Sequence, residues 1–254
     1  MLRALAVAAT LLLVAGAARA EWSMFGEYQR FRWTEPTIGV KEKGPLWGIG
    51  LNWDQDKPER LAFRYRGKYY FGRVDYDGST LITNQPVQTQ VDYDGLLNEL
   101  QLTYRRHESP TRVVVGFGLD YWNRQLSDVQ REEWWVYFVR VGAEWTQRYR
   151  DGWFFGGGIK YPFYVYENPH ATSIGFTEET KLYPEGKLSL YADLGYRRGY
   201  VMVSAFYDSW RFEQSATERT SGPPCVAAFG TQTCGLFQPA SNADMYGIRL
   251  HVFF

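Results

Sequence analysis

Residues Tyr246 to Phe254 read YGIRLHVFF, and this stretch decides the fold of the chain. Every second residue in it is apolar or aromatic. These residues are Tyr246, Ile248, Leu250, Val252 and Phe254. Gly247, Arg249, His251 and Phe253 occupy the positions between them. A period of two residues predicts a β-strand whose two faces meet different environments.

The same alternation recurs along the chain in segments of about ten to sixteen residues. It predicts ten strands, over residues 22–33, 45–54, 60–74, 91–106, 111–124, 133–147, 152–166, 186–197, 199–212 and 245–254. The links between them alternate in length. Short links fall at 55–59, 107–110, 149–151 and 198–199, and long links at 34–44, 75–90, 125–132, 167–185 and 213–244. Outer-membrane barrels have an even number of strands, short periplasmic turns and long extracellular loops.

Composition excludes several other classes of protein. The 254 residues include 18% aromatic side chains, yet the mean hydropathy is −0.40. A helical membrane protein needs apolar runs of about 20 residues, and a disordered chain is poor in aromatic residues. Lys and Arg together number 28, as do Asp and Glu, so there is no basic field for nucleic acid.

The first twenty residues predict a cleaved secretory signal peptide. Arg3 supplies a positive start, Ala4 to Ala18 form an almost continuous apolar run, and Ala18-Arg19-Ala20 fits an A-x-A cleavage site. A single barrel domain over residues 21–254 would remain after cleavage.

The polar face of the predicted strands carries both positive and negative charges. Its charged residues are Arg64, Arg66, Lys68, Glu99, Arg105, Arg112, Asp120, Arg140, Glu144, Lys160, Asp193 and Arg249. Glycines such as Gly48 and Gly116 share that face, which is typical of a crowded lumen. A soluble lipocalin-like barrel or sandwich would instead turn its apolar face inward.

Aromatic residues cluster near the strand ends and favour the membrane barrel over the soluble one. The clusters are Trp47/Trp53, Tyr121/Trp122, Trp134/Trp135 and Tyr161/Phe163. Two aromatic girdles at the membrane interfaces are typical of outer-membrane barrels.

The signal peptide, the alternating segments and the terminal Phe254 together resemble the outer-membrane β-barrel proteins of Gram-negative bacteria. Members of that group typically end in Phe, with apolar or aromatic residues at alternating upstream positions, as from Tyr246 to Val252 here. The resemblance implies a Gram-negative outer-membrane location among lipid and lipopolysaccharide, and insertion by the barrel-assembly machinery. We therefore expect an all-β, transmembrane, antiparallel up-and-down barrel of ten strands.

Ten strands bear on function. Eight strands give an interior just filled by side chains, whereas sixteen or more leave an aqueous channel. The charges of the polar face can pair across such a narrow lumen as a buried ionic network. We expect a structural or surface-interaction barrel that acts through its extracellular loops. A narrow channel or small-solute transporter, with a preference for anions, is the alternative.

An enzyme is less expected. Outer-membrane barrels include omptin-type proteases, whose sites join an acidic pair to an Asp–His pair at the extracellular rim, and lipid-modifying enzymes. This chain has acidic pairs but no Asp-x-His motif, and His170 is flanked by Pro169 and Ala171. His107-Glu108-Ser109 has the H-x-S spacing of some deacylases but stands before Pro110 in a turn. The sequence therefore predicts no catalytic residues.

The segment Val-Asp-Tyr-Asp-Gly occurs twice, at residues 74–78 and 91–95. The copies end one predicted strand and begin the next, so they are expected to face each other. Four carboxylates in one place repel unless a cation lies among them, and hard cations prefer oxygen ligands. Ca²⁺ or Mg²⁺ at Asp75, Asp77, Asp92 and Asp94 is one hypothesis. The other is that Asp and Gly form turns while each Tyr joins the outer aromatic belt. No other cofactor is expected.

Cys225 and Cys234 are the two cysteines, and both fall in the predicted loop 213–244. Exported chains pass through an oxidising periplasm, so a single pair of cysteines predicts a disulfide. The spacing is not that of a zinc site, and no His or acidic residue lies between them.

Overall fold

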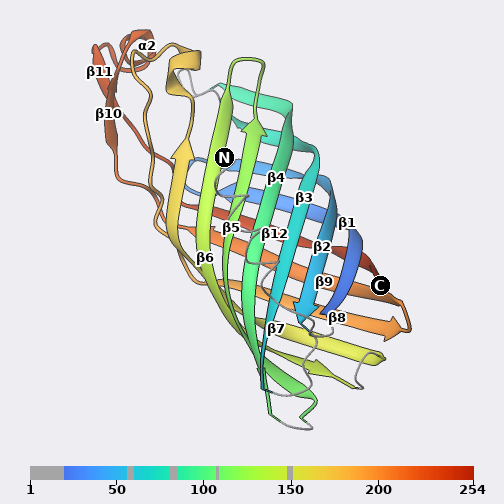
Figure 1. Ribbon diagram of the computed structural model, residues 1–254. Coiled ribbons are helices and arrows are strands. Elements are labelled where there is room, and N and C mark those ends of the chain that lie inside the picture. The colour runs from blue at the N-terminus through green and yellow to red at the C-terminus, as the bar shows by residue number, and fades with distance from the viewer. Residues whose placement is uncertain (1–19, 56–59, 80–84, 107–108, 148–150) are drawn as a thin grey trace.

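The computed structural model describes residues 20–55, 60–79, 85–106, 109–147 and 151–254. The predicted signal peptide, apart from Ala20, lies outside the described residues. Ten long antiparallel strands close into a barrel (Figure 1). They are β1 (Ala20–Glu35), β2 (Val40–Gln55), β3 (Arg60–Ser79), β4 (Pro86–Arg105), β5 (Thr111–Gln125), β6 (Arg131–Thr146), β7 (Gly152–Asn168), β8 (Ser189–Arg198), β9 (Val201–Phe212) and β12 (Ser241–Phe253).

Each barrel strand pairs with its neighbours in sequence, and β1 pairs with β12 to close the barrel. The predicted fold class, an antiparallel up-and-down barrel of ten strands, is therefore confirmed. β1 starts and β12 ends at the same end of the barrel, which also carries the short connection between β8 and β9. We call it the turn end. The opposite end carries residues 169–188 and 213–240, and we call it the loop end.

Three of the predicted long loops are short connections or largely strand. In the predicted loop 75–90, β3 runs to Ser79 and β4 begins at Pro86. β1 reaches Glu35 and β2 begins at Val40, so the predicted loop 34–44 is mostly strand. β5 and β6 likewise extend into the predicted loop 125–132, up to Gln125 and from Arg131. The strands continue because their alternating inward residues are buried, as Trp33 is in β1.

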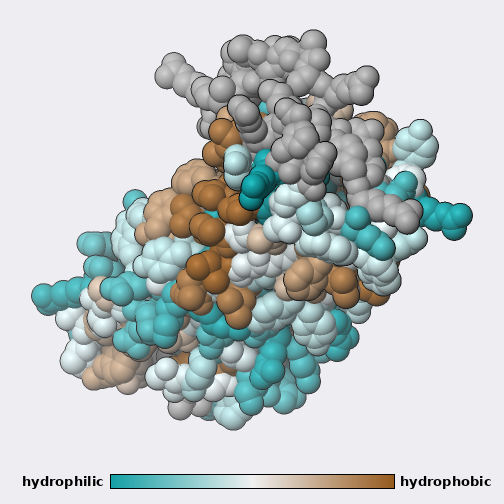
Figure 2. Space-filling model, turned by 90° about the horizontal axis from the view of Figure 1, so that it is seen from below, coloured by the Kyte–Doolittle hydropathy of each residue, from teal (hydrophilic) through white to brown (hydrophobic). Residues whose placement is uncertain are grey.

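The outer face of the barrel carries a continuous apolar band. Its exposed residues include Met24, Trp47, Ile49, Leu61, Phe63, Tyr69, Phe71, Leu96, Leu100, Leu102, Val113, Val115, Phe117, Val139, Val141, Phe155, Ile159, Phe163, Leu190, Leu194, Val203, Ile248, Leu250 and Val252. In the described strands, the charged residues that point outward lie at or beyond the edges of this band, as Asp94 does opposite Phe71. Figure 2 shows apolar side chains gathered on one face, with hydrophilic side chains toward its ends.

The two long loops of the loop end pack against each other as a small cap (Figure 1). The cap contains the 3-10 helix η1 (Ala171–Ile174), the strands β10 (Glu218–Ser221) and β11 (Thr233–Leu236), and the helix α2 (Pro223–Phe229). Ala171, Phe176 and Cys225 form its apolar centre. The Thr177 amide donates a 2.9 Å hydrogen bond to the Ser221 carbonyl, which joins the loops. No helix in the described part of the chain is long and apolar enough to cross a membrane.

Candidate functional site

The barrel interior is the candidate site, because charged residues lie inside it. All twelve charged residues of the predicted lumen network lie on the inward face of their strands, buried or half-buried. They concentrate toward the turn end and the middle of the barrel. In the loop-end half of the interior, most of the buried residues are aromatic or aliphatic.

An aromatic core fills the loop-end half of the interior. It consists of Trp33, Trp122, Trp134, Phe138, Trp210 and Phe212, all buried. The prediction that Trp122 and Trp134 belong to an outer aromatic girdle is therefore wrong. Their strand neighbours Tyr121 and Trp135 point outward instead, with ring centroids 4.6 Å apart. Beyond the apolar band the outside of the barrel is polar, so the apolar side chains turn inward.

Ion pairs cross the middle of the barrel below the aromatic core. Glu27 accepts hydrogen bonds from Lys68 Nζ at 2.8 Å and from Arg249 Nε at 2.9 Å, and Arg249 Nη1 also donates to Asp193 at 3.0 Å. Arg140 Nη1 donates to Glu99 at 2.9 Å. These contacts join strands that are far apart in sequence.

Lys160 and Asp120 lie where the charges meet the aromatic core. Lys160 forms an ion pair with Asp208, and its Nζ lies 3.4 Å from the centroid of the Trp210 ring. Asp120 accepts hydrogen bonds from the Tyr70 hydroxyl at 3.0 Å and from Trp210 Nε1 at 3.1 Å. Through Trp210, the aromatic core thus contacts both Lys160 and Asp120 of the ionic network.

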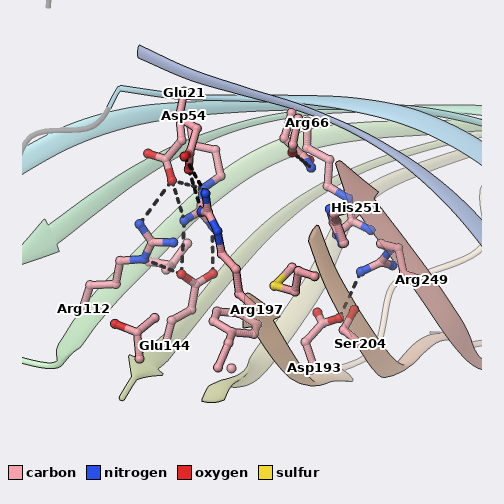
Figure 3. A pocket seen from close by; sticks show the side chains of 18 of the residues that line it. Glu21, Asp54, Arg66, Arg112, Glu144, Asp193, Arg197, Ser204, Arg249 and His251 are labelled. Carbon is pink, nitrogen blue, oxygen red and sulfur yellow. Dashed lines mark hydrogen bonds and ion pairs between the residues drawn. The ribbon is translucent and has the colours of Figure 1, made fainter. Parts of the chain in front are cut away.

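A second network lies at the turn end (Figure 3). Arg64 bridges two carboxylates: its Nη2 is 3.0 Å from Asp54 Oδ2 and its Nη1 is 2.8 Å from Glu144 Oε1. Arg112 contacts the same two carboxylates. Sequence analysis placed both arginines and Glu144 in the lumen network but did not include Asp54, which lies at the end of its predicted strand.

A cavity of about 200 Å³ lies beside this network and reaches the strand ends of the turn end. We call it the turn-end cavity. Its lining includes seven arginines and five carboxylates. They are Arg64, Arg66, Arg105, Arg112, Arg140, Arg197, Arg249, Glu21, Asp54, Glu144, Asp151 and Asp193. An interior lined by guanidinium groups favours oxyanions over cations.

A cluster of buried glutamates surrounds Arg124 at the loop end, beyond the apolar band. Arg124 contacts Glu42, and its Nη1 lies 2.6 Å from Glu132 and 3.6 Å from Glu35. Sequence analysis missed this cluster because three of these four residues fall in segments predicted as loops.

Glu167 adds a fourth buried carboxylate to the same region. Its side chain is 1% exposed, and its Oε2 has no hydrogen-bond partner among the residues that the structure describes. Burial and the neighbouring carboxylates Glu132 and Glu35 hold the pKa of Glu167 well above its usual range. Burial likewise raises the pKa of Glu132, against the attraction of Arg124.

The duplicated segments lie side by side on β3 and β4, with Val74 opposite Val91. Their aspartates point outward, whereas Tyr76 and Tyr93 are buried inside the barrel, so neither Tyr belongs to an outer belt. Among the described residues, no group of three or more acidic, His or Cys side chains is arranged to hold a metal ion.

Each aspartate with an observed partner contacts a different residue. Arg73 Nε donates to Asp92 at 2.6 Å, Asn123 donates to Asp94 at 3.1 Å, and Gln90 donates to Asp75 at 3.5 Å. The four carboxylates therefore do not form the cluster that the hypothesis required. Cation binding at this rim stays a prediction, and the described residues form no ready-made group of ligands for it.

Cys225 and Cys234 form a disulfide between α2 and β11, as predicted. The residues of the predicted assembly signal, Tyr246, Ile248, Leu250, Val252 and Phe254, are all exposed along β12 and at the chain end. His170 Nε2 lies 3.4 Å from Glu133 and from Arg131, at the base of the cap. These contacts do not form an Asp–His or Ser–His pair.

Comparisons with known proteins add little to this picture. No protein-family model matches the chain. An L-type lectin-domain containing receptor kinase IV.1 from Arabidopsis thaliana is 32% identical over 97 residues, which is 37% of this chain and 14% of that protein. The chain thus spans less than a sixth of that relative, and the match gives it no activity.

Three solved outer-membrane structures are similar in overall shape. The protease OmpT from Escherichia coli is 12% identical, with 92% of this chain and 96% of that chain covered and a TM-score of 0.45. An outer membrane channel from Pseudomonas putida F1 is 12% identical, with 94% and 97% covered and a TM-score of 0.45. OprG from Pseudomonas aeruginosa is 11% identical, with 94% and 98% covered and a TM-score of 0.39. At these values the three proteins transfer no function to this chain.

Proposed function

We propose that this chain is an integral outer-membrane barrel that is closed to solutes and acts through its loop-end cap. The apolar band supports the membrane location. A soluble protein does not expose a continuous apolar surface around its circumference, because water penalises it. In lipid the same surface is stabilised, and a closed barrel leaves no unpaired strand edge.

The orientation of the barrel follows from the same reasoning. The loop end, with its cap, would face outward beside the lipopolysaccharide, and the turn end would face the periplasm. Insertion would use the barrel-assembly machinery, for which the exposed alternating residues of β12 fit the pattern of the assembly signal.

The aromatic core is the single observation that supports a closed barrel. Trp134 is 0% exposed and contacts Trp33, Trp122 and Phe212, with ring centroids 5.3–5.5 Å away. Packed rings in the loop-end half leave the turn-end cavity without a continuous water path through that half. A closed barrel of this kind has no transport role, which leaves the outward cap as the functional surface.

Conductance of the refolded protein tests this proposal. Single insertions into a planar bilayer should give no stable open steps, and a known porin inserted under the same conditions provides the positive control. Stable open steps from the unmodified protein would contradict the closed barrel and favour the alternative, a narrow channel. The described histidines make no Ser–His or Asp–His pair.

A further inference from the structure

The turn-end cavity contains polar groups that the ionic networks do not use. Five of its arginines, Arg64, Arg112, Arg140, Arg197 and Arg249, form ion pairs with carboxylates. Arg105 is also not without a partner, so Arg66 is the exception. It has no ion pair or hydrogen bond with any residue that the structure describes.

Two further polar side chains of the cavity also have no partner. Ser204 is 2% exposed and His251 is 6% exposed, and both line the cavity. The Ser204 hydroxyl and both ring nitrogens of His251 have no hydrogen-bond partner among the described residues. A buried polar group without a partner costs about 1–3 kcal/mol, so a ligand that forms hydrogen bonds with these groups would offset that cost.

The Phe25 ring brings Arg66 and His251 to one place. The Phe25 ring centroid is 5.5 Å from the Arg66 guanidinium carbon and 5.2 Å from the His251 ring centroid. Arg249, whose register partner on β9 is Ser204, lies 5.2 Å from the same ring. Figure 3 shows the side chains of Arg66, Ser204, Arg249 and His251 on one side of the cavity, opposite the Arg112–Glu144 pair.

These groups share one chemistry, because each can donate a hydrogen bond. A guanidinium offers a planar fork that matches two oxygens of a carboxylate or phosphate, and a hydroxyl and a neutral imidazole each offer one more donor. Asp193 also lies in this part of the cavity, but Arg249 already pairs with it at 3.0 Å. The arrangement therefore suits an oxyanion beside Arg66.

We propose that the turn-end cavity binds a small molecule with a carboxylate or phosphate group, held by Arg66, Ser204 and His251. The cavity volume of about 200 Å³ limits the ligand to a small molecule. In the proposed orientation the ligand enters from the periplasm. The binding site does not depend on the aromatic core. An experiment can therefore refute the binding site without refuting the closed barrel, and can refute the closed barrel without refuting the binding site.

Histidine NMR of the full-length protein in detergent micelles tests the site. The chain has three histidines, and His251→Gln identifies the signal of His251. Sodium phosphate and sodium acetate are titrated separately at fixed pH and ionic strength, with chloride as the reference salt. We expect a saturable shift of the His251 signal with at least one oxyanion, and none of the His170 signal. Saturation by phosphate alone assigns a phosphate ligand, and saturation by acetate alone assigns a carboxylate.

Arg66→Gln should weaken binding about tenfold, because a charge-assisted hydrogen bond is lost. Arg219→Gln, which removes an exposed arginine of the cap, is the matched control and should bind as the unmodified protein does. Ser204→Ala gives a second test if Arg66→Gln fails to fold, and should weaken binding several-fold. No saturable shift with either anion, or unchanged binding by folded Arg66→Gln or Ser204→Ala, would overturn the proposal.

Discussion

Trp122 and Trp134 stack inside the barrel, with ring centroids 5.4 Å apart and ring planes 9° apart. They occupy directly opposed positions on β5 and β6. Trp33 meets Trp134 edge to face, with centroids 5.3 Å apart, and Phe212 lies 5.5 Å from it. Trp122, Trp33 and Phe212 thus all contact Trp134. Replacing Trp134 is therefore the most direct test of whether the aromatic core closes the barrel.

Trp134→Ala should lower the free energy of unfolding by about 3–5 kcal/mol, because it leaves a cavity in a packed interior. It should also open a water path and produce conductance where the unmodified protein shows none. Denaturant unfolding in lipid vesicles and planar-bilayer recording measure the two effects.

Trp135→Ala is the matched control for Trp134→Ala. Trp135 is the next residue, points outward and contacts Tyr121 rather than the aromatic core. We expect a smaller loss of stability and no conductance from this variant. Equal losses for both variants, without conductance from Trp134→Ala, would show that the core does not close the barrel.

Period-two alternation was sufficient to predict the ten strands, but not which face points inward along their whole length. In β1, Met24 and Tyr28 point outward in the apolar band, whereas Arg30 and Arg32 point outward beyond it. The polarity of the two faces therefore reverses where the surroundings of the barrel change from lipid to water. Sequence analysis grouped aromatic residues by their nearness to strand ends, without regard to the face on which each lies, and so assigned Trp122 and Trp134 to the outside.

The site was predictable only in part for a related reason. The twelve charges of the predicted lumen network lie within regular alternation and could be assigned to one face. Arg66 is one of these twelve, but alternation gives no information about its lack of a partner. The cluster around Arg124 depends on strand ends such as Glu35 and Glu132, where strand extension is decided by contacts across the barrel.

Stability should depend on pH through Glu167. Its pKa is raised in the folded protein, and unfolding returns it to an ordinary value. Between these two pKa values the folded state binds more protons, so the stabilising contribution is complete below the unfolded pKa and is lost as pH rises through the folded pKa. Denaturant midpoints should therefore fall as pH rises from the ordinary pKa of a glutamate toward the raised pKa of Glu167.

Glu167→Gln should flatten this pH dependence, because a neutral amide replaces the titrating carboxyl at nearly the same size. Glu133→Gln is the control, since Glu133 pairs with Arg131 outside the buried cluster. If Glu167→Gln kept the slope of the unmodified protein, another group would be responsible for it.

The disulfide should stabilise the cap and leave the barrel unchanged. Cys225 and Cys234 are nine residues apart in sequence, and the buried Cys225 packs with Ala171 and Phe176. Replacing both cysteines by Ser should lower the free energy of opening of the cap by about 2–3 kcal/mol. Limited proteolysis should then cleave residues 213–240 faster, while the barrel keeps its unfolding midpoint. A fall in that midpoint with unchanged cleavage would contradict a local role.

Arg32 and Lys43 occupy directly opposed positions on β1 and β2, and both are exposed on the outer face. Arg30 and Lys41 lie next to them on the same face, just beyond the Tyr28 and Trp47 rings, whose centroids are 4.9 Å apart. Like charges directly opposite each other destabilise a strand pair unless an anion lies between them. Asp75 opposes Lys43 on β3, and Asp244 opposes Arg32 on β12. We propose that lipopolysaccharide phosphates add further anions here, each basic residue contributing about 1 kcal/mol.

Lipopolysaccharide should therefore raise the melting temperature of the unmodified barrel in phospholipid vesicles, and Arg32→Gln/Lys43→Gln should reduce that rise. Without lipopolysaccharide the double variant should melt at the same temperature or higher, because the repulsion between the two side chains has been removed. The double variant would thus lose stability relative to the unmodified protein only in the presence of lipopolysaccharide. A loss of packing would instead lower its melting temperature both with and without lipopolysaccharide. Arg219→Gln, in the cap and away from this patch, should behave as the unmodified protein in both kinds of vesicle. An undiminished rise in the double variant would show that lipopolysaccharide binds elsewhere on the barrel.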